Sequence, residues 1–522
     1  MKKILGFVGR ILLHGIVLGI IWLDLCYVMI NEWAAIALTI AWIAGVRVVE
    51  RVVTDRRRKD AKDLDINVTN SAKDEKHGKA RIAKVRSGKI FFVVLDAIIL
   101  LCMIVATQFS PYWNSSVFRK NLNWEENGSL VFSKKDALAD YEFMMKYLKK
   151  IHPLAHGGLP EEVESRAKEV REWIEGQEQI EGYVLARRLE SILSLLGDGH
   201  TVVEEDYDAY HVMKYVYEHN KAGHVLIGIN DVPFEEFLVL HPDVDSYETV
   251  SYGVRMIKNR VSNLEGLKYL GIDISGEIKY NALTEDGEAV TEVVTAEDFL
   301  APEEYNAYVK SVTGDDLTAG EDRGFVYYDV DAEHDLAILT LTSCRCNQVY
   351  KDTVAKMFKE VHEKGIQNVC VDLRSNGGGS SMVANEFIKY LDVDVYKEWG
   401  CELRVGPLLI PLEGRTVKNP KKSQVFTGNV YVLTGVRTYS SAMDFAMLIQ
   451  DNGIGKLVGQ PCGNLPGSYG QVTSFVLPKT GLYFQTSTTK WYRVDTSKNQ
   501  EPLIPDLECP EAKALEVLLE NL

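Results

Sequence analysis

Three long apolar stretches dominate the N-terminal part of the chain: Ile11 to Ile30, Trp33 to Val49 and Ile90 to Phe109. Each has roughly the 17 to 25 residues that a helix needs to cross the hydrocarbon core of a bilayer. The pattern predicts three transmembrane helices. A lipid membrane is therefore an expected partner of this segment.

Charged side chains inside and between these stretches bear on their role and orientation. His14, Asp24 and Asp96 lie within them, and we interpret all three as interfacial or helix-pairing contacts, although such residues are also typical of membrane sensors. The loop from Arg47 to Lys89 is rich in Lys and Arg, which favours the cytoplasmic side. The sequence thus predicts a multi-pass protein of the cell membrane whose catalytic part, after Phe109, is extracytoplasmic.

The pattern changes after a short linker around Pro111 to Glu126. Apolar residues recur at helical spacing between Ser133 and Leu196, which predicts a helical lobe that ends near Gly197. Between Gly223 and Val294 the chain has short β-rich runs separated by turn residues. These runs predict a small insert domain.

From Leu336 onward, short apolar runs alternate with segments of helical periodicity, which is typical of an α/β domain. The predicted strands are Leu336–Leu341, Val369–Leu373, Val430–Thr434 and Lys456–Gly459, and the predicted helices are Val354–Glu363, Met382–Leu391 and Ala442–Gln450. The predicted domains are a membrane anchor over residues 1–109, a linker and helical lobe over 110–205, a β-rich insert over 206–330 and an α/β core over 331–522.

Composition limits the partners of the chain. It has 58 Lys and Arg against 74 Asp and Glu, a net charge of −16, and its N-terminal part is the basic one. Because affinity for nucleic acid depends on cationic side chains, nucleic acid is excluded as a partner. Cys344 and Cys346 form a single C-x-C pair, which is a weak metal signal. We therefore predict buried thiols, no metal and no cofactor.

Two predicted strand-to-helix junctions carry groups suited to acyl transfer. Three glycines end the segment Asp372 to Gly379, where free N–H groups can bind an oxyanion, although such a run also fits a mobile turn. Ser440 and Ser441 open a predicted helix directly after a strand, which is the position of a nucleophile, although serines there also cap helices. Taken singly, neither junction decides the chemistry.

Two further residues complete the candidate set. His200 lies in a glycine-flanked turn beyond the helical lobe, and imidazole can accept a serine proton at neutral pH. A surface histidine is the alternative. Glu501 precedes a Pro-Leu-Ile-Pro-Asp segment and offers a carboxylate to orient the imidazole.

The order of these elements resembles the tail-specific (C-terminal processing) serine peptidase superfamily, which is marked by D-L-R-x-N-x-G-G, then T-x-S-[SA]-A, then G-x-x-x-G and a closing P-D. The resemblance runs from about Ser133 to Pro510 and is most specific between Asp372 and Gly463. It implies an α/β fold with a ClpP/crotonase-like spiral core. It also implies a serine endopeptidase that cleaves proteins or peptides.

The resemblance implies a role for each candidate. Ser440 aligns with the nucleophile, and the amides of Gly378 and Ser441 align with the oxyanion hole. One branch of the superfamily uses a lysine base downstream of the serine, and Leu465 occupies that place here. The dyad of that branch is therefore absent.

The other branch, similar to tricorn, takes a histidine from the preceding lobe and a glutamate near the chain's end, and His200 and Glu501 match these positions. The insert lacks an obvious carboxylate-binding loop, so a degenerate PDZ-like module is favoured over an intact one. A non-catalytic binding protein on the same fold is the alternative. Asp372 and Arg374 are interpreted as a structural ion pair.

Overall fold

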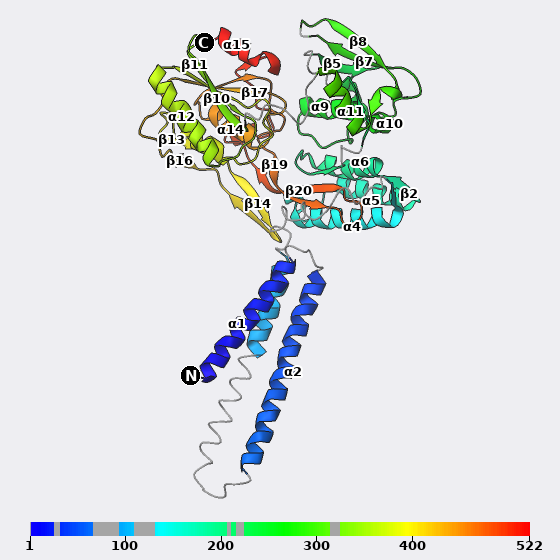
Figure 1. The fold of residues 1–522 in the computed structure, drawn as a ribbon, viewed down its shortest axis with the longest axis vertical. Helices are drawn as coiled ribbons and strands as arrows, with labels where there is room; N and C mark the ends of the chain where they lie inside the picture. Colours follow the sequence, from blue (N-terminus) through cyan, green and yellow to red (C-terminus); the bar gives the residue numbers. More distant parts are fainter. Residues whose placement is uncertain are drawn as a thin grey trace. The chain divides into compact units, whose positions relative to one another are not determined.

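The computed structural model describes residues 2–25, 32–65, 93–108, 131–205, 210–215, 224–284, 286–313 and 324–522 (Figure 1). It divides into two compact units, Met1–Asn121 with Val405–Pro407, and Leu122–Arg404 with Leu408–Leu522. The first unit is helical, and the second is a mixture of helices and sheets. The predicted linker around Pro111 to Glu126 lies outside the described residues.

The first unit contains helices α1 (Lys2–Leu23) and α2 (Glu32–Asp65) and a further helix over residues 93–107. Hydrogen bonds between side chains join these helices. The indole of Trp42 donates to Nδ1 of His14 at 3.0 Å, and Arg47 Nε donates to Asp96 Oδ2 at 2.7 Å. His14 and Asp96 therefore form the contacts between helices that the sequence predicted.

The membrane prediction is wrong. No helix in the described part of the first unit, or elsewhere among the described residues, is long and apolar enough to cross a bilayer. The second predicted stretch belongs to α2, which runs on through Arg51 to Asp65, and residues 93–107 are the described helical part of the third stretch. The fold class is corrected in its three transmembrane helices, and the multi-pass, extracytoplasmic location is withdrawn.

The core of the second unit is a six-stranded sheet in the order β10-β11-β12-β17-β18-β21. The strands are β10 (Val326–Asp331), β11 (Leu336–Leu341), β12 (Asn368–Asp372), β17 (Asn429–Thr434), β18 (Lys456–Gly459) and β21 (Leu507–Glu508). Strands β10 and β11 are antiparallel, and every other neighbouring pair is parallel. The carboxyl ends of β12 and β17 therefore meet at one edge, where loops build sites in such sheets.

Alternating residues of these strands pack on opposite faces of the sheet. Val369 and Val371 join a large core with helices α12 (Gln348–Lys364), α13 (Met382–Ile388) and α14 (Ser441–Asp451), whereas Cys370 packs with α15 (Ala514–Glu520). Both faces of the parallel strands are therefore covered, which explains their continuous apolar sequence. The predicted α/β alternation is confirmed for these elements.

The strand-end ion pair is also confirmed. Arg374 binds both carboxylate oxygens of Asp372, at 3.0 and 2.7 Å, and donates to the carbonyl of Glu511 at 2.9 Å. This bidentate pair ties the glycine loop to the C-terminal segment.

A second sheet has the order β15-β14-β20-β19, with β3 also pairing to β20. Its strands are β3 (Val202–Glu204), β14 (Cys401–Val405), β15 (Leu408–Leu412), β19 (Tyr469–Val476) and β20 (Tyr483–Trp491). Strands β13 (Val395–Lys397) and β16 (Thr416–Lys418) form a separate pair. Because β3 directly follows His200, its pairing with β20 anchors the histidine loop to the core.

The helical lobe consists of α4 (Lys134–Ile151), α5 (Glu161–Glu175) and α6 (Gly182–Leu193), with the short strands β1 (Val131–Ser133) and β2 (Gln179–Glu181). Asp136 lies in the first turn of α4, and Ser133 caps that turn by accepting from the Asp136 amide at 3.2 Å. The apolar positions of α6 are buried, as their helical spacing predicts. The lobe ends at Gly197, whose φ of 61° is the left-handed value that favours glycine.

The insert is built on a four-stranded antiparallel sheet in the order β6-β5-β7-β8. Its elements are β5 (Val225–Ile229), β6 (Val232–Pro233), β7 (Ile278–Leu283), β8 (Ala289–Val294), α8 (Phe234–Leu240), α9 (Val250–Val261), α10 (Leu264–Tyr269) and α11 (Pro302–Thr313), with the pair β4 (Val212–Met213) and β9 (Phe299–Leu300). Helices α8 to α10 pack on the sheet in their own apolar cluster.

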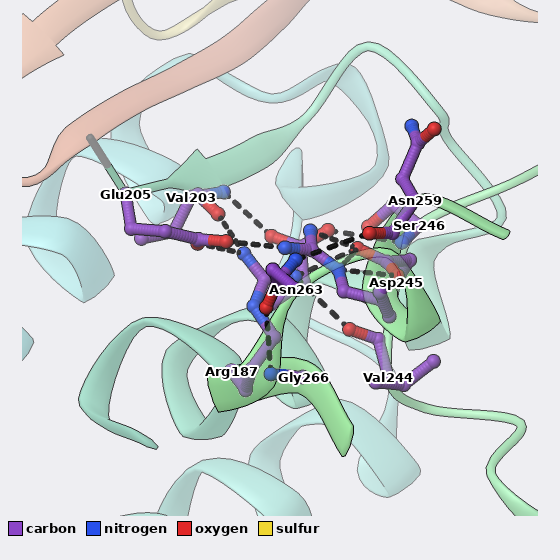
Figure 2. Close-up of polar contacts among 11 residues, drawn as sticks. Arg187, Val203, Glu205, Val244, Asp245, Ser246, Asn259, Asn263 and Gly266 are labelled. Atoms are coloured by element: carbon purple, nitrogen blue, oxygen red, sulfur yellow. Dashed lines mark hydrogen bonds and ion pairs between the residues drawn. The ribbon is translucent and has the colours of Figure 1, made fainter. Parts of the chain in front are cut away.

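A buried ionic cluster joins the insert to the helical lobe (Figure 2). Arg187 of α6 donates to Asp245 at 2.7 Å and to Glu205 at 2.6 Å, and Arg260 of α9 contacts the same two carboxylates. All four side chains are at most 3% exposed. Each charge therefore depends on its partners, because water does not reach it.

Candidate active site

The turn between β17 and α14 holds Ser440 in a backbone conformation that few residues adopt. Its φ is 55° and its ψ is −126°. Such strained serines are typical of nucleophile elbows, where the side chain projects from a sharp strand-to-helix turn. The amide of Ser440 donates to Asn464 Oδ1 at 2.7 Å, which fixes the turn.

Ser441 is used differently from its neighbour. Its hydroxyl donates to the carbonyl of Gly379 at 3.1 Å and accepts from Ser381 at 3.0 Å. Ser381 also donates to the carboxylate of Asp444 at 2.8 Å. The Ser441 hydroxyl is therefore part of a structural network, whereas its amide is in the first turn of α14, where N–H groups have no partner within the helix.

The glycine loop approaches Ser440 closely. A Cβ on Gly378 would lie 2.7 Å from Cβ of Ser440, and Gly378 and Gly379 have φ values of 105° and 137°. Only glycine fits both the contact and the dihedral angles. The Gly378 amide donates to Asn376 Oδ1 at 2.8 Å, and Asn376 in turn donates from its side chain to Leu341.

His200 lies between two carboxylates. Its Nδ1 is 3.7 Å from Oδ1 of Asp198 and 3.8 Å from Oε1 of Glu248, within ion-pair distance but too long for a hydrogen bond. The side chains are 11%, 0% and 1% exposed, respectively. Among the described residues, neither ring nitrogen has a hydrogen-bond partner. Nε2 lies on the side of Gly470, where an added Cβ would be 3.8 Å away.

Asp198 is fixed from several sides. His152, fully buried, contacts Oδ2 at 3.0 Å, Thr201 donates to the same oxygen at 2.5 Å, and the amide of His200 donates to Oδ1 at 2.8 Å. Since Nδ1 of His152 accepts from the amide of Leu154 at 3.2 Å, its Nε2 is the nitrogen that donates to Asp198. The carboxylate therefore has a fixed orientation towards His200.

These contacts set the charges in the site. Burial alone would lower the pKa of His200, but Asp198 and Glu248 stabilise the imidazolium and raise the pKa to about 9. Burial also opposes the charge of Asp198, yet His152 and His200 hold the pKa of this carboxyl well below its usual range. Burial raises the pKa of Asp444 to about 6, despite the hydrogen bond from Ser381.

A cavity of about 210 Å³ brings three of the predicted residues together: Ser440, Ser441 and His200. Gly379 lines it, and β19 and β20 contribute Gly470, Gln471 and Trp491 among others. The site thus combines a strained serine, a buried imidazole and backbone amides around one small space. This is the set of groups that acyl transfer needs.

Glu501 is placed differently. It is exposed and is not among the residues that line the cavity, and its amide donates to the carbonyl of Lys498 at 3.0 Å. The carboxylates beside His200 are Asp198 and Glu248, which the sequence reasoning missed. Asp198 could have been identified from the sequence, because it stands two residues before the histidine in the same tight turn. Glu248 had none.

Among the described residues, Asp198, His200 and Glu248 also have ligand atoms within 4.8 Å of one another. Their contacts fit proton handling, because the two carboxylates favour an imidazolium at His200 and an imidazolium has no lone pair to offer a metal ion. The glycine loop and the serine turn complete the same chemistry on the other side of the cavity.

The sequence comparison decides the family. The model of peptidase family S41 matches residues 335–509, which include Ser440 and the glycine loop. This part of the chain is similar to peptidase family S41. The predicted tail-specific superfamily is thereby confirmed, and the chain is a serine-type peptidase. No curated protein matches the sequence.

Several solved structures are similar to this chain. Mature CPAF complexed with lactacystin has 13% identity and a TM-score of 0.49, covering 74% of this chain and 97% of that chain. The photosystem II D1 C-terminal processing protease has 13% identity and a TM-score of 0.39, covering 74% and 96%. The tricorn protease has 14% identity and a TM-score of 0.34, covering 74% and 37%. Because these scores are below 0.5, the assignment rests on the matched sequence.

Proposed function

We propose that this S41 peptidase is an endopeptidase of proteins or peptides in which Ser440 is the nucleophile and His200 the general base. The observation that carries the proposal is the strained turn of Ser440, which faces the same cavity as His200. A serine that only capped a helix would have no need of a positive φ. The hydroxyl of Ser441, in contrast, is committed to Gly379 and Ser381.

The residues support a conventional acyl-transfer sequence. Nε2 of His200 takes the proton of Ser440 Oγ as the oxygen attacks the scissile carbonyl, and it returns that proton to the leaving amine. Water then enters, His200 takes its proton, and the acyl-enzyme is hydrolysed. Asp198 stabilises the imidazolium formed in each half of the reaction and holds Nδ1 as the protonated nitrogen.

Two backbone amides are proposed to stabilise the oxyanion. The first is that of Ser441, at the N-terminal end of α14, where the helix favours negative charge. The glycine loop supplies the second. Since the Gly378 amide already donates to Asn376, we assign this role to Gly379, which lines the cavity, in place of the Gly378 amide that the resemblance implied.

Labelling of the full-length protein with a fluorophosphonate probe tests this function. The wild type is expected to take up the probe, Ser440→Ala to lose labelling, and Ser441→Ala to keep it, because the Ser441 hydroxyl is engaged by Gly379 and Ser381. Each variant is checked by circular dichroism and its melting temperature. A folded wild type that does not label, or a Ser440→Ala variant that still does, contradicts the assignment.

A further inference from the structure

We propose that Glu248 of the insert is a second positioning residue for His200, so that the docked insert completes the active site of the peptidase core. This inference rests on the proposed function of His200 as the base. The insert then has a direct part in catalysis, in addition to any part in choosing substrates. The argument depends on three sets of contacts around Glu248.

The first set holds the loop of the base. Oε1 of Glu248 accepts from the amide of Gly199 at 3.2 Å and lies 3.8 Å from Nδ1 of His200. Only glycine fits at position 199, because a Cβ there would lie 2.2 Å from the hydroxyl oxygen of Tyr439. The close approach brings the histidine loop, the insert carboxylate and the residue before the nucleophile into one buried contact.

The second set holds the loop of the nucleophile. Oε2 of Glu248 accepts from the amide of Leu465 at 2.9 Å, and the adjacent Thr249 donates to the carbonyl of Gly463 at 2.9 Å. Asn464, between these two residues, accepts from the amide of Ser440. One carboxylate of the insert therefore holds the loop of the base directly and is linked to the nucleophile through Leu465 and Asn464.

The third set is aromatic. Tyr252 of α9 packs on Tyr439 with ring centroids 4.8 Å apart, and Tyr439 packs on His200 at the same centroid distance. Through Tyr252, the insert thus also contacts the turn that holds the nucleophile. A carboxylate that served only to cap a turn would not need to contact the histidine loop and the Leu465 loop at once.

The charges around His200 make the role of Glu248 measurable. The titratable groups that face the imidazole are Asp198 from its own loop, Glu248 from the insert, and Tyr439 and Asp444 from the turn and first turn of α14. Both carboxylates near Nδ1 favour the imidazolium. Neutralising Glu248 should therefore lower the pKa of His200, whereas loosening a remote contact should not.

The first measurement does not need turnover. In the full-length Ser440→Ala protein with ¹³C-labelled histidine, the His200 signal is assigned by its loss in His200→Ala and titrated by NMR. Adding Glu248→Gln is expected to lower the His200 pKa by about 1 unit, the usual size for an opposite charge at this distance. Glu236→Gln, an exposed insert variant, is the control and should leave it unchanged.

The second measurement uses the active enzyme. On the plateau above about pH 9, Glu248→Gln is expected to lower kcat by about 10- to 100-fold with KM within about 2-fold, and the acidic limb of kcat/KM should move to lower pH. An unchanged His200 pKa and an unmoved limb overturn the inference. If the pKa shifts but the parent protein neither labels nor cleaves, the proposed function fails while the contact between Glu248 and His200 stands.

Discussion

Replacing His200 with alanine is expected to lower kcat by roughly 10⁴- to 10⁶-fold, because the attacking hydroxyl then has no base and the leaving amine no acid. The remaining activity comes from substrate binding and the oxyanion amides. The fold should survive, since the ring makes no hydrogen bond of its own. The measurement is steady-state cleavage of a fluorogenic peptide or unfolded protein substrate.

The pH profile separates this loss from a structural one. With a pKa of about 9, His200 is mainly protonated at neutral pH, so the wild-type kcat/KM should rise almost tenfold per pH unit and level off near pH 9. The residual activity of His200→Ala should lack this limb. His334→Ala is the matched control. His334 is an exposed histidine of the α/β domain that pairs with Asp331, and its replacement should change neither kcat nor the pH profile of kcat/KM. A limb that persists without His200 would refute its role as the base.

The core elements were predictable because local pattern and tertiary burial agree there. The central residues of β12, Val369 to Val371, are apolar because helices cover both faces of the sheet, and α12 and α14 turn an apolar stripe towards one of these faces. The N-terminal helices were wrongly predicted to span a membrane because only the local apolar pattern was used. An apolar stretch defines no helix boundary, and α2 continues past its stretch through charged residues to Asp65.

The candidate site divides in the same way. Ser440, Ser441 and the glycine loop follow strands that meet at one sheet edge, so their proximity is already contained in the order of the motifs. Glu248 comes from the insert, and only the packing of α9 against the serine turn brings it to His200. Glu501 has the expected place in the sequence, but its side chain is exposed and is not among the residues that line the cavity.

Replacing Arg187 with methionine is expected to destabilise the second unit by about 3 to 5 kcal/mol, the usual cost of removing one partner from a buried ionic cluster. Methionine fills much of the volume but leaves Glu205 and Asp245 with Arg260 as their remaining cation. The carbonyls of Val203 and Val244 also lose their guanidinium donor. Urea unfolding and the calorimetric melting temperature measure the loss.

Arg188→Met provides the matched control on the same helix. Arg188 is exposed and rests on the ring of Trp173 at 5.1 Å, so its loss should cost no more than about 1 kcal/mol. Because β3 connects the cluster to the His200 loop, Arg187→Met should also reduce probe labelling of Ser440, whereas Arg188→Met should not. Equal stability of the two variants would mean that the cluster is solvated and that other contacts hold the insert to the helical lobe.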